Sequence, residues 1–183
     1  MSTHENGGPF GLNLSRTLRS YLQGTRDYSI PRFIVEFTLI AFPLKVLFVL
    51  PWVLLGGKLG STTEAVYKGD PVQFLLLACV AAPLLETFVG QWIPIRLTWF
   101  FSRRWSVLLL VSATVFAAQH LHVGFSGFLF TFPVAFLLSW SFLVYREYSR
   151  WRAYWVTATI HSLHNFITAI VFLLTYTNQS GVK

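Results

Sequence analysis

Apolar residues fill five long stretches of this 183-residue chain, and polar residues gather in the short segments between them. The stretches cover about 33–55, 71–101, 105–121, 128–145 and 153–176. A helix of roughly 17–25 apolar residues crosses the hydrocarbon core of a bilayer. The pattern therefore predicts an all-α, polytopic bundle of about five transmembrane helices.

The bundle is expected to occupy residues 32–176, between two polar tails at 1–31 and 177–183. The first tail has no uninterrupted apolar run, so a cleavable signal peptide is not expected. Internal repeats, low-complexity tracts and linkers between domains are not visible either. The sequence therefore predicts one compact helical domain.

Composition points to the same class of protein. Hydrophobic residues make up 54% of the chain and charged residues only 11%, whereas soluble domains carry about a quarter charged residues. A net charge of +7 could indicate nucleic acid as a partner, but in a membrane protein basic residues more often mark the cytoplasmic loops. We expect the lipid bilayer, and not nucleic acid, as a partner.

The basic residues also predict the orientation of the helices. With five spans, one side of the membrane receives most of them: Arg16, Arg19, Arg26, Arg32, Arg96, Arg103, Arg104, Arg146, Arg150 and Arg152. The other side receives only Lys58, Lys68 and Lys183. Because cytoplasmic loops are enriched in Lys and Arg, we expect the N-terminus in the cytoplasm and the C-terminus outside.

One carboxylate, Glu86, lies in the middle of the second apolar stretch. An ionisable side chain at that depth costs roughly 2.5–3.5 kcal/mol on insertion scales, so it is a candidate functional residue. The second and third stretches form a hairpin that turns near residue 102. Glu86 is about 16 residues before this turn and His120 about 18 after it, so the two are expected at a similar depth.

The fifth stretch adds two more polar residues to this layer. His161 and Asn165 are four residues apart and share one face of a helix. His164, three residues after His161, is expected to line the edge of a cavity at this layer. His122 is near the end of a span, where a histidine needs no special function. A layer with Glu86, His120, His161 and Asn165 could serve hydrolysis, a proton relay or metal binding.

Three short motifs in this order resemble the CPBP family, which includes CAAX prenyl proteases and bacteriocin-processing or Abi proteins. Phe116-x-x-x-His120 and His161-x-x-x-Asn165 match the family's second and third motifs. The first motif, Glu-Glu-x-x-x-Arg, is represented by Glu86-Thr87-x-x-x-Gln91, in which Thr87 replaces the second Glu and Gln91 replaces the Arg. The resemblance covers about 71–174, the four-helix core of the family.

The resemblance implies an intramembrane endopeptidase that cleaves a membrane-associated peptide or protein tail. Glu86 would activate water together with His120, and His161 and Asn165 would stabilise the oxyanion. No covalent intermediate and no cofactor are implied. Four residues are expected to support these: Thr87, Gln91, Phe116 and His164.

Three alternatives remain open from the sequence. Glu86, His120 and His161 could bind zinc as an open site, although no H-E-x-x-H helix is present. The neutral Thr87 and Gln91 could mark an inactive CPBP-fold immunity or interaction protein. Buried Glu and His could also belong to a small proton-coupled transporter. The small size favours a prokaryotic member, in the inner (plasma) membrane.

Overall fold

The computed structural model describes residues 29–59, 67 and 69–180, with side chains up to Tyr176. Its described part is helical and contains no strand. The predicted N-terminal tail lies almost wholly outside the described residues. In chain order the elements are α2 (Ile30–Leu54), α4 (Pro71–Leu76), the π-helix η1 (Leu77–Ala81), α5 (Ala82–Thr87), the π-helix η2 (Phe88–Trp92), α6 (Ile93–Phe101), α7 (Trp105–Ala118), the 3-10 turn η3 (Leu121–Val123), α8 (Phe125–Arg146) and α9 (Arg150–Ser180).

Four of the helical stretches are long and apolar enough to cross a membrane: Ile30–Leu54, Pro71–Phe101, Phe125–Arg146 and Arg150–Tyr176. α4, η1, α5, η2 and α6 together make up the second of these, so they form one interrupted helix. The helical membrane bundle predicted from the sequence is confirmed.

The third predicted span is shorter than expected. α7 has 14 residues, or about 21 Å, and it ends at Ala118 instead of near residue 121. His120 lies beyond the helix end, in a turn that leads through η3 into α8. Two glycines make this turn possible. Gly124 has a φ of 93°, and Gly127 contacts the carbonyl of His120 so closely that a Cβ would collide with it.

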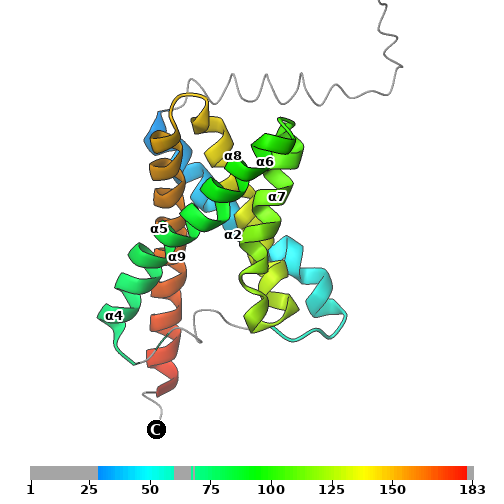
Figure 1. Ribbon diagram of the computed structural model, residues 1–183. Helices are drawn as coiled ribbons and strands as arrows, with labels where there is room; N and C mark the ends of the chain where they lie inside the picture. The colour runs from blue at the N-terminus through cyan, green and yellow to red at the C-terminus, as the bar shows by residue number, and fades with distance from the viewer. Residues whose placement is uncertain (1–28, 60–66, 68, 181–183) are drawn as a thin grey trace, which may run out of the picture.

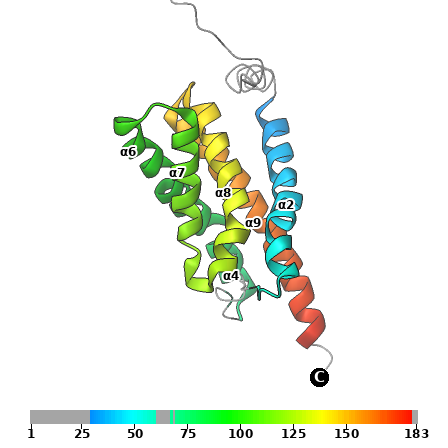
Figure 2. The same ribbon diagram turned by 90° about the vertical axis from the view of Figure 1, so that its right-hand side faces the viewer.

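The other helices pack obliquely around α8 and α9. The interrupted helix α4–α6 crosses α9 diagonally from one end of the bundle to the other (Figure 1). α7 and α8 run side by side, and α2 packs on α8 and α9 (Figure 2). This crossing brings α5 in the middle of the interrupted helix against α9.

The core lies where α2, α7, α8 and α9 meet. Phe33, Leu108 and Leu138 are completely buried there. Many large apolar side chains face outward instead, for example Leu47, Leu85 and Phe101. Outward apolar side chains are normal for a helix that faces lipid, because lipid tails are as apolar as the core.

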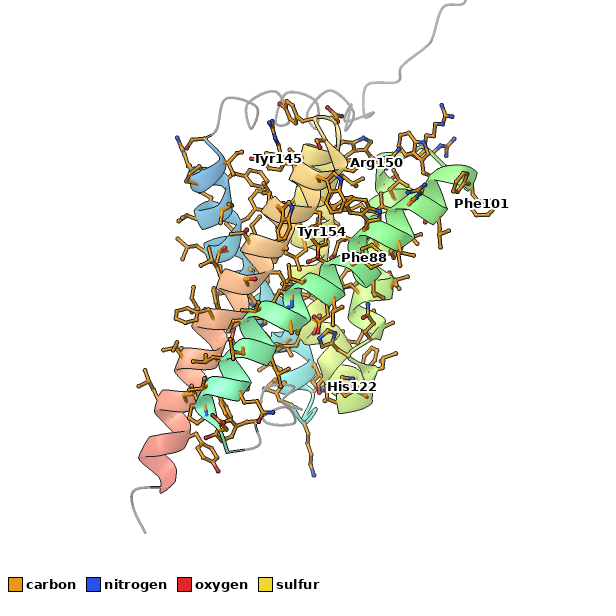
Figure 3. The ribbon with its side chains drawn as sticks, turned by 60° about the vertical axis from the view of Figure 1, so that its left-hand side comes forward. Phe88, Phe101, His122, Tyr145, Arg150 and Tyr154 are labelled. Carbon is orange, nitrogen blue, oxygen red and sulfur yellow. The ribbon has the colours of Figure 1, made fainter. Side chains whose placement is uncertain are left out.

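One end of the bundle carries the basic turns. Phe101, Tyr145 and Arg150 lie at this end, whereas His122 lies toward the other (Figure 3). The guanidinium groups of Arg146 and Arg103 approach the ring of Trp99, at 4.1 and 5.7 Å from its centroid. Aromatic and basic side chains together are typical of a membrane–water interface.

Candidate active site

Glu86 lies on a short α-helical piece, α5, between two π-helical segments. Each π segment is followed by a proline, Pro83 after η1 and Pro94 after η2. π segments are rare and are frequently found at functional sites. Proline has no N–H to donate, so each segment leaves helix carbonyls in need of another donor.

Asn165 supplies such a donor at η1. The N–H of Ala82 bonds to the carbonyl of Leu77, so it does not reach Ala78 as it would in an α-helix. Pro83 cannot replace it. The side chain of Asn165 on α9 donates to the carbonyl of Ala78 at 2.9 Å. Asn165 therefore joins α9 to the interrupted helix at Ala78, eight residues before Glu86. This bond leaves the second N–H of its amide for another acceptor.

Ser112 supplies the corresponding donor at η2. Pro94 has no N–H for the carbonyl of Gly90, four residues earlier, and the Ser112 hydroxyl donates to this carbonyl at 2.8 Å. Ser112 in turn accepts from the Ser139 hydroxyl, also at 2.8 Å. Gly90 allows α7 to come this close, because a Cβ at this position would collide with the ring of Phe116.

Glu86 and His161 form the central contact of the site. The Nε2 atom of His161 lies 3.5 Å from Oε2 of Glu86. The His161 side chain is 4% exposed and that of Glu86 is 29% exposed, so the carboxylate is the accessible partner. The hydroxyl of Tyr154, about two turns before His161 on α9, donates to the carbonyl of Leu84 at 3.0 Å and so fixes α5 against α9. Tyr154 and the helix that carries Phe88 lie side by side in Figure 3.

Phe116 connects the two histidines of the predicted site. Its ring is buried, stacks on His120 with 5.5 Å between ring centroids, and meets His161 edge-on at 5.3 Å. The Nδ1 atom of His120 lies 3.3 Å from the carbonyl of Phe116. Because this contact occupies Nδ1, the other nitrogen of His120 is the one available to a water or a substrate.

Thr87 and Gln91, the two departures from the family motif, are both completely buried. The hydroxyl of Thr87 and both polar atoms of the Gln91 side chain have no hydrogen-bond partner. Leaving a buried polar group unpaired costs about 1–3 kcal/mol, so these atoms, on the same helical stretch as Glu86, keep the capacity to bond a water molecule.

Lys45 of α2, which the sequence motifs did not single out, lies close to a predicted site residue. Its Nζ atom lies 3.1 Å from Nε2 of His164, which is buried. His122, for which no function was expected, lies near His120, with 6.2 Å between the ring centroids. No sequence pattern predicts the contact of Lys45, because it depends on how separate segments of the chain pack.

The described residues contain no group of three His, Cys, Asp or Glu side chains arranged to hold a metal ion. The zinc set of Glu86, His120 and His161 therefore has no geometric support in this part of the chain.

A comparison with protein-family models matches residues 68–167, more than half of the chain, to the Rce1-like type II CAAX prenyl endopeptidases. This chain belongs to that family. No curated protein and no solved structure matched it. Membership of the Rce1-like family, part of the CPBP family, identifies the protein in general as an intramembrane endopeptidase.

The Rce1-like region contains every residue of the candidate site that was predicted from the sequence. It does not include α2. Lys45 is therefore a feature of this chain that lies outside the matched region and still reaches the site.

Proposed function

We propose that this Rce1-like protein hydrolyses a peptide bond of a membrane-associated peptide or protein tail with water activated by Glu86. The observation that carries the proposal is the contact between Glu86 and His161 at 3.5 Å, inside a bundle of membrane helices. A carboxylate at this depth is costly and therefore needs a reason to be there. Activation of water is a function that a carboxylate in this position can serve.

In this mechanism Glu86 takes a proton from a water molecule that His120 also contacts, and the resulting hydroxide adds to the scissile carbonyl. In the resting protein the Nε2–H of His161 holds the Glu86 carboxylate; once Glu86 has taken the proton, this N–H is released and donates, with the second N–H of Asn165, to the oxyanion of the tetrahedral intermediate. Glu86 then returns the proton to the leaving nitrogen. The accessible carboxylate beside a buried His161 supports this division of roles.

We also propose that the end of the bundle with Arg103, Arg146 and Arg150 faces the cytoplasm. The helix starts and turns at this end carry most of the arginines among the described residues. The C-terminus then lies outside. A reporter fused to Lys183 that is active only outside the cytoplasm tests this orientation; activity of a cytoplasmic reporter there contradicts it.

Comparative proteomics of membranes and secreted proteins tests the function. Cells carrying wild-type protein are compared with cells carrying Glu86→Gln or His161→Ala at equal membrane expression. We expect at least one protein that is shortened in wild-type cells and full-length in both variants. Identical patterns in all three would contradict proteolysis by this site.

A second candidate is a protein of the same fold without catalysis. Thr87 and Gln91 favour it, because they place neutral side chains where the family motif has a charged pair. Such a protein would keep its biological effect in the Glu86→Gln variant, and it would leave every cellular protein at full length.

Uptake into liposomes that depends on a proton gradient and on Glu86 would support transport instead.

A further inference from the structure

Lys45 is a half-buried lysine of α2 whose amino group contacts residues of α8 and α9. Its Nζ atom lies 3.1 Å from His164 on α9 and 4.4 Å from the centroid of the Phe130 ring on α8. It is nine residues from the end of α2 at Leu54, or roughly 14 Å along the helix. A lysine that reached the membrane surface would not make these contacts.

No carboxylate in the described part of the chain lies within ion-pair distance of Lys45. A charge that is partly removed from water and has no counter-charge is unfavourable, and an imidazole and an aromatic ring compensate for only part of the cost. An ammonium in this position is therefore well placed to receive an anion.

His164 adds a second donor to Lys45. A lysine ammonium has no lone pair, so Nε2 of His164 accepts its hydrogen bond and the ring proton lies on Nδ1. His164 is 3% exposed, and this Nδ1 atom has no hydrogen-bond partner. The ring is fixed from its other side by Phe42, at 4.6 Å between ring centroids. The ammonium and the imidazole together offer several N–H groups and no negative charge.

We propose that Lys45 and His164 bind a carboxylate of the substrate, either its C-terminal carboxylate or an acidic side chain. This inference rests on the proposed function, because it names a second contact for the peptide that Glu86 cleaves. Lysine and imidazole N–H groups form charge-assisted hydrogen bonds with carboxylates. Lys45 is thus a residue that selects substrates.

The spacing along α9 relates this contact to the bond that is cleaved. His164 follows His161 by three residues, which is about 4.5 Å along the helix axis. An extended peptide advances about 3.3 Å per residue. The carboxylate is therefore expected within a few residues of the scissile bond, on the side away from the basic turns.

Binding measurements on the full chain in lipid nanodiscs test the proposal. The protein carries Glu86→Gln so that no peptide is consumed. One probe is a short fluorescent peptide with an N-terminal acyl chain and a free C-terminus, and its partner is the same peptide as a C-terminal amide. A second pair consists of two C-terminally amidated peptides that differ only in an internal Glu or Gln. A third pair, dodecanoate and dodecanamide, is used as competitors of the fluorescent peptide.

We expect at least one peptide acid, terminal or internal, to bind roughly ten- to a hundredfold more tightly than its neutral partner. Lys45→Met and Lys45→Gln should remove this preference. Lys58→Met, which removes an exposed lysine, should leave it unchanged. Thermal unfolding of each variant shows that the bundle is intact, and Lys45→Gln keeps the test valid if Lys45→Met does not fold.

Equal or undetectable binding of every acid and neutral partner would overturn the proposal, as would a preference that survives both Lys45 variants. A preference for dodecanoate alone would assign the site to a fatty acid and not to the substrate. Because the binding measurement requires no cleavage, a preference for the acid can be observed even if Glu86 does not catalyse proteolysis. Conversely, if the wild-type protein cleaves the acid and amide peptides at equal rates, the carboxylate-binding proposal is overturned while proteolysis stands.

Discussion

Two groups of buried polar side chains lie next to each other in this bundle, and only one of them is saturated with hydrogen bonds. The serine–threonine group consists of Ser112, Ser139, Ser141 and Thr157, which are completely buried. Ser112 donates to the carbonyl of Gly90 and bonds to Ser139, and Thr157 donates to Ser141 at 3.2 Å. Each hydroxyl of this group has a partner within the protein.

The other group, which we call the Glu86 layer, consists of Glu86, Thr87, Gln91, His161 and His164. Thr87, Gln91, His161 and His164 each carry at least one buried polar atom without a partner. Thr157 precedes His161 by one turn of α9, and Gly90 is next to Gln91, so the two groups are neighbours. Polar residues that serve only the fold can satisfy one another, whereas residues that bind a water or a substrate need to keep atoms free.

The largest effect on function among the following changes is expected for His161→Gln. The variant removes the contact with Glu86 and one donor to the oxyanion, so kcat should fall roughly 10²- to 10³-fold with little change in KM. Steady-state kinetics with the substrate found by proteomics measure this split. A higher KM with unchanged kcat would assign His161 to substrate binding alone.

Gly90→Ala tests the close approach that connects the two groups. The new methyl would collide with Phe116, and overpacking of this kind costs about 1–3 kcal/mol. Because Phe116 supports both His120 and His161, cleavage should slow as well. Thermal unfolding and cleavage rate are measured together, and the double variant Gly90→Ala/Phe116→Leu should recover stability. No loss in the single variant would contradict the packing described.

Ser112→Ala acts on the saturated group and should affect stability only. It leaves the carbonyl of Gly90 and the hydroxyl of Ser139 without this partner, at a cost of about 1–3 kcal/mol. The cleavage rate of the folded protein should stay within about threefold of wild type. A large fall in rate at unchanged stability would place Ser112 in the Glu86 layer.

Gln91→Leu should change stability less than Gly90→Ala or Ser112→Ala, and it should raise stability where they lower it. It removes two buried, unpaired polar atoms from a completely buried position, so the protein should become more stable by about 1 kcal/mol or less. The cleavage rate should fall, because the polar environment of Glu86 is reduced. A loss of stability would show that Gln91 has a partner within the fold.

The sequence was sufficient to predict the helical membrane bundle and the family. Apolar stretches of this length have few stable structures other than membrane-spanning helices. The motifs that begin at Glu86, Phe116 and His161 follow the order of the family's three motifs. The end of α7 at Ala118 was not predicted, because residues 119–121 include no glycine or proline that would end a helix, and the turn depends on Gly124 and Gly127.

The position of Asn165 and of Lys45 could not be predicted for a different reason. Asn165 bonds to Ala78 only because η1 and Pro83 free that carbonyl, and π segments have no reliable sequence pattern. Lys45 meets His164 across 119 residues of sequence. Such contacts depend on the crossing angles of whole helices, which local patterns do not encode.

The most direct test of the central claim is the cleavage rate of purified Glu86→Gln protein in liposomes, measured beside wild type and Glu36→Gln. Glu36 is a matched control, because it is a carboxylate that pairs with Arg32 on the exposed side of α2. We predict that Glu86→Gln is slower than wild type by roughly 10²-fold or more, with thermal stability no lower than wild type, and that Glu36→Gln cleaves at the wild-type rate. A Glu86→Gln protein that cleaves at the wild-type rate would contradict the assignment of Glu86 as the residue that activates water.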